Sequence, residues 1–169
     1  MQMLNRYFAP FALLLILSAI YFSEPDPRDY KLSLGILAAS ILVNWALTKY
    51  AYRWFQWVQY MKALQVWANF IWSIPLFWLL QPYWAPMWLL FALAPATAAL
   101  NTSRVHAFLC AAASAGTMLA IYHQRGVFDG GIGPAGGMAF VHAGFIIVLT
   151  MFVHALAQAA LRLRDPQLS

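Results

Sequence analysis

Hydrophobic residues along the chain fall into six long runs, separated by short polar stretches. A membrane-spanning helix needs roughly 20 mostly apolar residues, and the first and fourth runs can reach across by recruiting interfacial residues. The pattern therefore predicts an all-α polytopic membrane protein with six transmembrane helices, at about Phe8–Phe22, Leu32–Thr48, Ala63–Leu80, Ala85–Leu100, Val105–Tyr122 and Met138–Leu161.

The composition supports the same conclusion. The chain is 63% hydrophobic and 9% charged, and its mean hydropathy is +0.67, whereas a soluble domain carries about 25% charged residues. So few charges could not cover the surface of a soluble protein. The six runs use nearly the whole sequence, which predicts a single transmembrane domain over residues 1–169.

The basic residues predict the orientation. With the N-terminus in the cytoplasm, three basic residues lie outside (Arg28, Lys31 and Arg125) and seven lie inside: Arg6, Lys49, Arg53, Lys62, Arg104, Arg162 and Arg164. Cytoplasmic loops carry the excess of Lys and Arg. We therefore expect both termini in the cytoplasm of a bacterial inner membrane, with the net charge of +5 facing anionic inner-leaflet lipids and no nucleic acid.

Prolines mark the connections and two of the spans. Pro25 and Pro27 lie in the outer connection Ser23–Lys31, where a fixed φ is expected to stop helix propagation before the second span. Pro75 and Pro95 fall inside predicted spans and are expected to kink them.

Small residues in the fifth and sixth runs predict tight helix packing. Ala112 and Gly116 are four residues apart, as are Ala111 and Ala115, and the sixth run adds a small group near its outer half: Ala139, Ala143 and Gly144. Small residues at this spacing let helix backbones approach closely. These faces pack against each other or against another protein, and the sequence leaves both open.

The segment Phe128–Gly137 contains Gly131, Gly133 and Gly136 at the G-x-G-x-x-G spacing of dinucleotide-binding loops. That motif needs a strand before it and a helix after it. Here a predicted membrane helix precedes it, Pro134 interrupts it, and the predicted topology places it outside the cytoplasm. We expect a flexible hairpin with glycines in its turns, and no nucleotide.

Four histidines are candidate ligands. His106 and His154 fall toward the inner side, and His123 and His142 toward the outer side, which resembles the two-level arrangement of a two-haem membrane cytochrome. The rise per residue separates His106 from His123 by about 25 Å along the fifth span. It separates His142 from His154 by about 18 Å along the sixth. The levels do not match, so no cofactor or metal is expected, and a b-type cytochrome stays an alternative.

Four polar residues within the predicted spans could matter for packing or function: Asn44, Asn69, Thr117 and His154. We expect the amides and the threonine to hydrogen-bond across helices. His154 is the most suggestive, since a titratable group inside a span is a functional hypothesis by default. No carboxylate falls within a predicted span, which argues against a proton- or sodium-coupled transporter. No Ser-His-Asp set, paired carboxylates or cysteine cluster is present, which predicts a protein that is not an enzyme.

The last span and its exit, AGFIIVLTMFVHALAQAALRLRD (Ala143–Asp165), and the short inner turn NTSR (Asn101–Arg104) resemble the N-terminal membrane region of sensor histidine kinases of the type IV pilus family. In that family the last span leads into a cytoplasmic signalling helix, which HALAQAALRLRD would begin here. The family's phospho-accepting histidine and ATP-binding domain have no counterpart in these residues. The resemblance implies a membrane sensing or docking unit that needs a partner.

The sequence therefore predicts a non-enzymatic inner-membrane accessory subunit or sensory module that works through helix–helix contacts with other membrane proteins or with itself. A transporter or membrane enzyme acting on small molecules or lipids is an alternative, because the third and fourth runs are rich in aromatic residues and contain Pro75 and Pro95.

Overall fold

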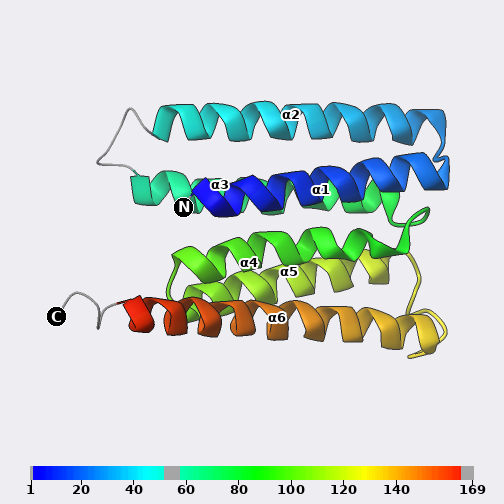
Figure 1. Ribbon diagram of the computed structural model, residues 1–169. Helices are drawn as coiled ribbons and strands as arrows, with labels where there is room; N and C mark the ends of the chain where they lie inside the picture. The colour runs from blue at the N-terminus through cyan, green and yellow to red at the C-terminus, as the bar shows by residue number, and fades with distance from the viewer. Residues whose placement is uncertain (1, 52–57, 165–169) are drawn as a thin grey trace. The chain divides into compact units, whose positions relative to one another are not determined.

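The computed structural model describes residues 2–51 and 58–164, and every regular element in these ranges is a helix (Figure 1). The prediction of an all-α protein is therefore confirmed for the described residues. The elements, in order, are α1 (Gln2–Ser23), α2 (Pro27–Ala51), α3 (Val58–Leu80), the 3₁₀ helix η2 (Ala85–Leu89), α4 (Leu90–Asn101), α5 (Arg104–Gln124) and α6 (Pro134–Arg164).

Three of these helices are long and apolar enough to cross a membrane, at Pro27–Leu47, Arg104–Gln124 and Pro134–Leu161. The remaining hydrophobic runs form shorter apolar helices, at Pro10–Ser23, Leu64–Leu80 and Ala85–Leu100. Helices of this length and composition indicate a membrane protein.

Two helices begin earlier than the sequence analysis predicts. α2 begins at Pro27, and the Tyr30 amide already donates to the Asp26 carbonyl at 2.9 Å. α6 begins at Pro134, so Gly136 is helical. Proline at the first helical position fits because its missing N–H would have no partner there. Helix propagation is thus interrupted between Ser23 and Pro27, and Pro27 itself is the first residue of α2.

The fourth hydrophobic run is divided. Ala85–Leu89 forms the 3₁₀ helix η2, with Pro86 in its first turn, and the α-helix begins at Leu90. Pro75 and Pro95 lie inside α3 and α4. Each proline lacks an N–H for the helix ladder and leaves a carbonyl one turn earlier without that bond.

The chain folds as two compact units, Met1–Leu93 and Ala94–Ser169. In the first unit, α2 and α3 pack along each other (Figure 1). Their core is built by bulky side chains, because the aromatic and leucine positions of α3 recur at helical spacing and face inward: Phe70, Leu76, Phe77 and Leu80. Phe91 completes this core, with its ring centroid 5.1 Å from that of Phe77 and the rings nearly perpendicular.

In the second unit, α5 and α6 run side by side in opposite directions (Figure 1). The buried face of α5 is made mostly of small residues: Ala107, Cys110, Ala111, Ser114 and Ala115. The buried face of α6 contains Ala139, Ala143 and Ile146. Small side chains let the two backbones approach closely, which replaces the hydrophobic driving force that lipid does not supply.

The turn between α3 and η2 is fastened to the start of α2. The Tyr83 hydroxyl donates to Asp26 Oδ2 at 3.2 Å and to Asp29 Oδ2 at 3.1 Å, and Trp84 stacks on Phe22 with ring centroids 6.0 Å apart. Desolvation first, and then the hydrogen bond to Asp29, raises the pKa of the Tyr83 phenol.

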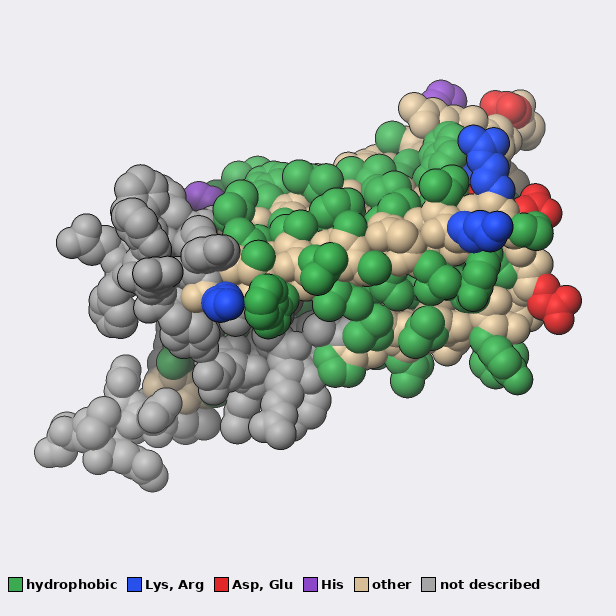
Figure 2. All heavy atoms as spheres, turned by 90° about the horizontal axis from the view of Figure 1, so that it is seen from above, with side chains coloured by type: hydrophobic (Ala, Val, Ile, Leu, Met, Phe, Trp, Pro, Cys, Tyr) green, Lys and Arg blue, Asp and Glu red, His purple; other side chains and the backbone are tan. Residues whose placement is uncertain are grey.

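Charged side chains of the described residues lie near helix ends, and hydrophobic side chains cover the middle of the face drawn in Figure 2. Arg28, Asp29 and Lys31 occupy the first turns of α2, and Lys49 lies in its last turn, 4.8 Å from the centre of the Trp45 ring. This distribution suits a helix whose ends meet the polar surfaces of a bilayer.

Candidate functional site

His154 is a buried titratable residue in the core of the second unit. It lies on the inward face of α6, and its Nδ1 is 2.8 Å from the Ala99 carbonyl oxygen. α4 ends at Asn101, so Ala99 is among the last four residues, whose carbonyls receive no N–H from their own helix. A ring N–H at Nδ1 therefore satisfies an otherwise open carbonyl, and it joins two helices through residues that are 55 positions apart.

The turn next to this contact is also closed by side chains. The Thr102 hydroxyl donates to the Ala98 carbonyl at 2.8 Å. Ser103 caps the N-terminus of α5 by accepting from the His106 amide, and its Oγ is 2.7 Å from His106 Nδ1. The α4–α5 turn is thus held locally by Thr102 and Ser103 and, through Ala99, by α6.

The other three histidines lie elsewhere. His106 is exposed in the first turn of α5, and His123 is exposed near its end, with its ring centroid 6.2 Å from that of Phe128. His142 is half-buried on α6. Among the residues that the structure describes, no three His, Cys, Asp or Glu side chains are placed to share a metal ion.

The two asparagines predicted to lie within spans are brought together in the first unit. Asn44 Nδ2 on α2 donates to Asn69 Oδ1 on α3 at 2.8 Å. Both side chains are partly buried, where an unpaired amide in hydrocarbon would be costly. The contact fixes the register of the α2–α3 pair, because a shift of either helix would separate the amides.

The predicted packing residues divide between two faces. Ala139 and Ala143 are buried on α6, and Ala111 and Ala115 occupy the buried face of α5. Ala112 is half-buried, whereas Gly116 and Gly144 are exposed, with nothing within 4 Å of an added Cβ. Of the two small-residue registers in α5, the one that begins at Ala111 packs within the unit.

The glycine segment connects two helices, and no strand is present in the described parts of the chain. Gly131 has φ of 88°, which suits a turn glycine, and Gly136 lies in the first turn of α6. A Cβ on Gly136 would lie 3.1 Å from Cδ1 of Phe128. The close approach of Phe128 to the start of α6 thus gives Gly136 a packing role.

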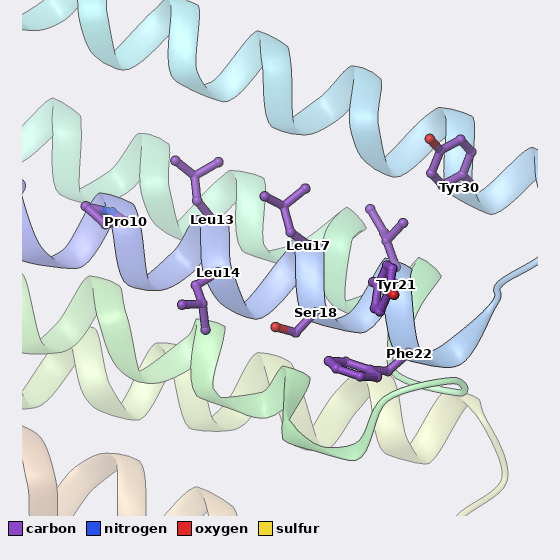
Figure 3. A pocket seen from close by; sticks show the side chains of 9 residues that line it. Pro10, Leu13, Leu14, Leu17, Ser18, Tyr21, Phe22 and Tyr30 are labelled. Atoms are coloured by element: carbon purple, nitrogen blue, oxygen red, sulfur yellow. The ribbon is translucent and has the colours of Figure 1, made fainter.

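A groove runs along α1 in the first unit (Figure 3). It has a volume of about 860 Å³ and is mostly apolar. Its lining comes from one helix except for Tyr30 of α2: Pro10, Leu13, Leu14, Leu17, Ser18, Ile20, Tyr21, Phe22 and Tyr30. The sequence does not reveal this groove, because its residues are ordinary for a membrane span and only folding places Tyr30 beside α1.

The long apolar helices and the polar contacts between them define the class of the protein, which is an all-α membrane protein. No protein-family model, curated protein or solved structure matches the chain. Its resemblance to the type IV pilus sensor kinases therefore remains a prediction from the span pattern and the exit of the last span.

Proposed function

We propose that the chain is a six-span, non-enzymatic inner-membrane module with both termini in the cytoplasm. It acts as an accessory subunit or sensory docking unit through helix–helix contacts. Three helices have the length to span a bilayer, and the three shorter apolar helices complete the crossing when interfacial residues are included. The distribution of basic residues supports the orientation.

The C-terminal part of α6 carries the proposal. Among the described side chains of this helix, which end at Leu161, His154 is the last buried one. Those that follow, from Ala155, are exposed apart from the half-buried Ala157. The helix nevertheless continues to Arg164. A helix that leaves its own bundle while keeping exposed Leu156 and several alanines presents a surface on which another helix can pack closely.

The contact between His154 and Ala99 gives this part of α6 a connection to the rest of the unit. A partner that displaces α6 must break or carry along this hydrogen bond. The displacement is then transmitted to the end of α4 and to the turn that Thr102 and Ser103 close. This connection supports a role in docking or signalling over a role as a passive anchor.

The docking role is tested by placing a photo-crosslinking residue at Leu156, with the same residue at Leu109, which is similarly exposed on α5, as the matched control. After mild extraction, mass spectrometry identifies the crosslinked species. We expect Leu156 to capture a membrane protein or a second copy of the chain in stoichiometric amount, and Leu109 to capture lipid. An isolated monomer with no crosslink from Leu156 contradicts the proposal.

The orientation is tested separately by single cysteines in a Cys110→Ser chain. Gly130→Cys lies in the connection before α6, and Ser103→Cys in the turn before α5, and both positions are exposed. In intact cells an impermeant maleimide is expected to label Gly130→Cys, and to label Ser103→Cys only after the membrane is opened. The reverse labelling pattern would show that the topology is opposite to the one proposed.

A further inference from the structure

We propose that the groove along α1 is a binding site for one phospholipid molecule, with an acyl chain lying along α1 and the phosphate at the start of α2. The occupant is a lipid of the leaflet that contains the α1–α2 connection. The proposal needs α1 and α2 to lie in the membrane, and it does not depend on the docking role of α6.

The length of the groove matches one leaflet. From Pro10 to Phe22 the lining covers 12 residue steps of α1, which is about 18 Å at 1.5 Å per residue. The hydrocarbon core of a bilayer is about 30 Å thick, so one leaflet contributes about 15 Å. A single acyl chain thus fits the groove from its deep end to the polar surface.

The polarity of the lining changes along its length, as that of a lipid does. Pro10, Leu13 and Leu14 line the deep end, and Tyr21 and Tyr30 lie at the end that faces the α1–α2 connection (Figure 3). Tyrosine places its ring against hydrocarbon and its hydroxyl at the polar boundary. The hydroxyls are therefore at the depth of a lipid's ester groups.

Charge complementarity identifies the lipid as a phospholipid. Arg28 and Lys31 lie within two residues of Tyr30 in the first turns of α2, and both are exposed. Neither forms an ion pair among the described residues. The neighbouring carboxylates Asp26 and Asp29 accept from Tyr83 instead. Two cations on long, flexible side chains are thus left for the phosphate.

A chain in the groove also makes packing contacts with α1. Each contact between an acyl chain and the side chains of α1 adds a small amount of dispersion energy. A bound chain makes these contacts along the whole groove, and the headgroup contacts hold it there when freely exchanging lipids are removed.

The test uses the full chain, reconstituted in vesicles of phosphatidylethanolamine and phosphatidylglycerol and then extracted in mild detergent. Native mass spectrometry counts the retained phospholipids. We expect one phospholipid per chain in the unmodified protein. Leu14→Trp and Leu17→Trp fill the groove and should abolish retention. Leu109→Trp, at a position 57% exposed against 65% for Leu14, is the matched control and should retain the lipid.

The headgroup contact is tested without altering the groove. Arg28→Gln and Lys31→Gln should each weaken retention about fivefold, as expected for one cation near a lipid surface, whereas Lys49→Gln at the other end of α2 should leave it unchanged. These variants decide the question if a tryptophan variant fails to fold. The proposal is overturned if the unmodified protein retains no phospholipid or if Leu109→Trp loses it equally. It is also overturned if Leu14→Trp changes the oligomer mass while lipid stays bound.

Discussion

The α2–α3 pair and the α5–α6 pair are both antiparallel hairpins, yet different side chains hold them together. α2 and α3 are joined by the hydrogen bond from Asn44 Nδ2 to Asn69 Oδ1, and the inward face of α3 carries bulky residues such as Phe77. α5 and α6 pack through alanines such as Ala111 and Ala143. Hydrophobicity alone does not bring helices together in lipid. A polar contact with bulky side chains holds the first pair, and close packing of small residues holds the second.

The two pairs also differ in where their polar link is made. In the first unit it joins the two helices of the pair, whereas in the second it joins His154 of α6 to the Ala99 carbonyl of α4. The first link fixes the register of a hairpin. The second ties a hairpin to the end of a third helix.

The largest expected effect comes from filling the small-residue interface. Ala111→Phe should destabilise the protein by about 3 kcal/mol, because the added ring forces apart helices that approach through alanine. Ala120→Phe, on the exposed side of α5, is the matched control and should change little. Unfolding of the detergent-solubilised protein, followed by circular dichroism, measures both. Equal stability of the two variants would show that close packing does not hold α5 against α6.

Removing the link to α4 should have the next largest effect. His154→Ala leaves a small cavity and an unpaired Ala99 carbonyl, with an expected loss of about 2 kcal/mol. His123→Ala, at an exposed position, is the comparison variant in the same unfolding experiment. If His154→Ala loses no more stability than His123→Ala, the side chain of His154 does not stabilise the second unit.

The amide pair of the first unit is measured by a double-mutant cycle. Asn44→Leu, Asn69→Leu and the double variant should give a coupling of about 0.6–1.7 kcal/mol, the range for hydrogen bonds between membrane helices. Simple additivity of the two single variants would mean that the bulky core alone determines the register of α2 and α3.

The smallest effect is expected at the turn of the first unit and depends on pH. Desolvation and then the hydrogen bond to Asp29 raise the pKa of Tyr83 above 10.0 in the folded protein, so the protonated phenol favours the fold below the unfolded pKa. That contribution is lost as the pH rises through the folded pKa. The unmodified protein should therefore lose more stability than Tyr83→Phe when the pH rises past 10.0. Parallel pH profiles of the unfolding midpoint would contradict this.

The helical class and the approximate position of each helix follow from the hydrophobic runs, because 20-residue apolar segments leave few alternatives. The ends were harder to predict. Pro27 and Pro134 were expected to lie outside helices, yet each is the first residue of one. Proline excludes the interior of a helix and favours its first position, and the hydrophobic pattern alone does not distinguish the two.

The contacts were predicted only in part. Asn44 and Asn69 stand out as polar residues within apolar runs, but the sequence does not specify that they meet. In α5, the Ala111–Ala115 and Ala112–Gly116 registers are equally small, and only the packed structure selects the first for the interface. The acceptor of His154 is a backbone carbonyl, which no residue type reveals.

The unequal lengths of α5 and α6 have a mechanical consequence. The apolar stretch of α5 covers 21 residues and that of α6 covers 28, which correspond to about 32 Å and 42 Å. Because the two helices pack side by side, α6 cannot tilt to shorten its crossing while α5 stays upright. No bilayer thickness matches both helices, and each ångström of mismatch deforms the surrounding lipid at a cost of a fraction of a kcal/mol. If both helices span the bilayer, the stability of the pair is therefore expected to depend on membrane thickness.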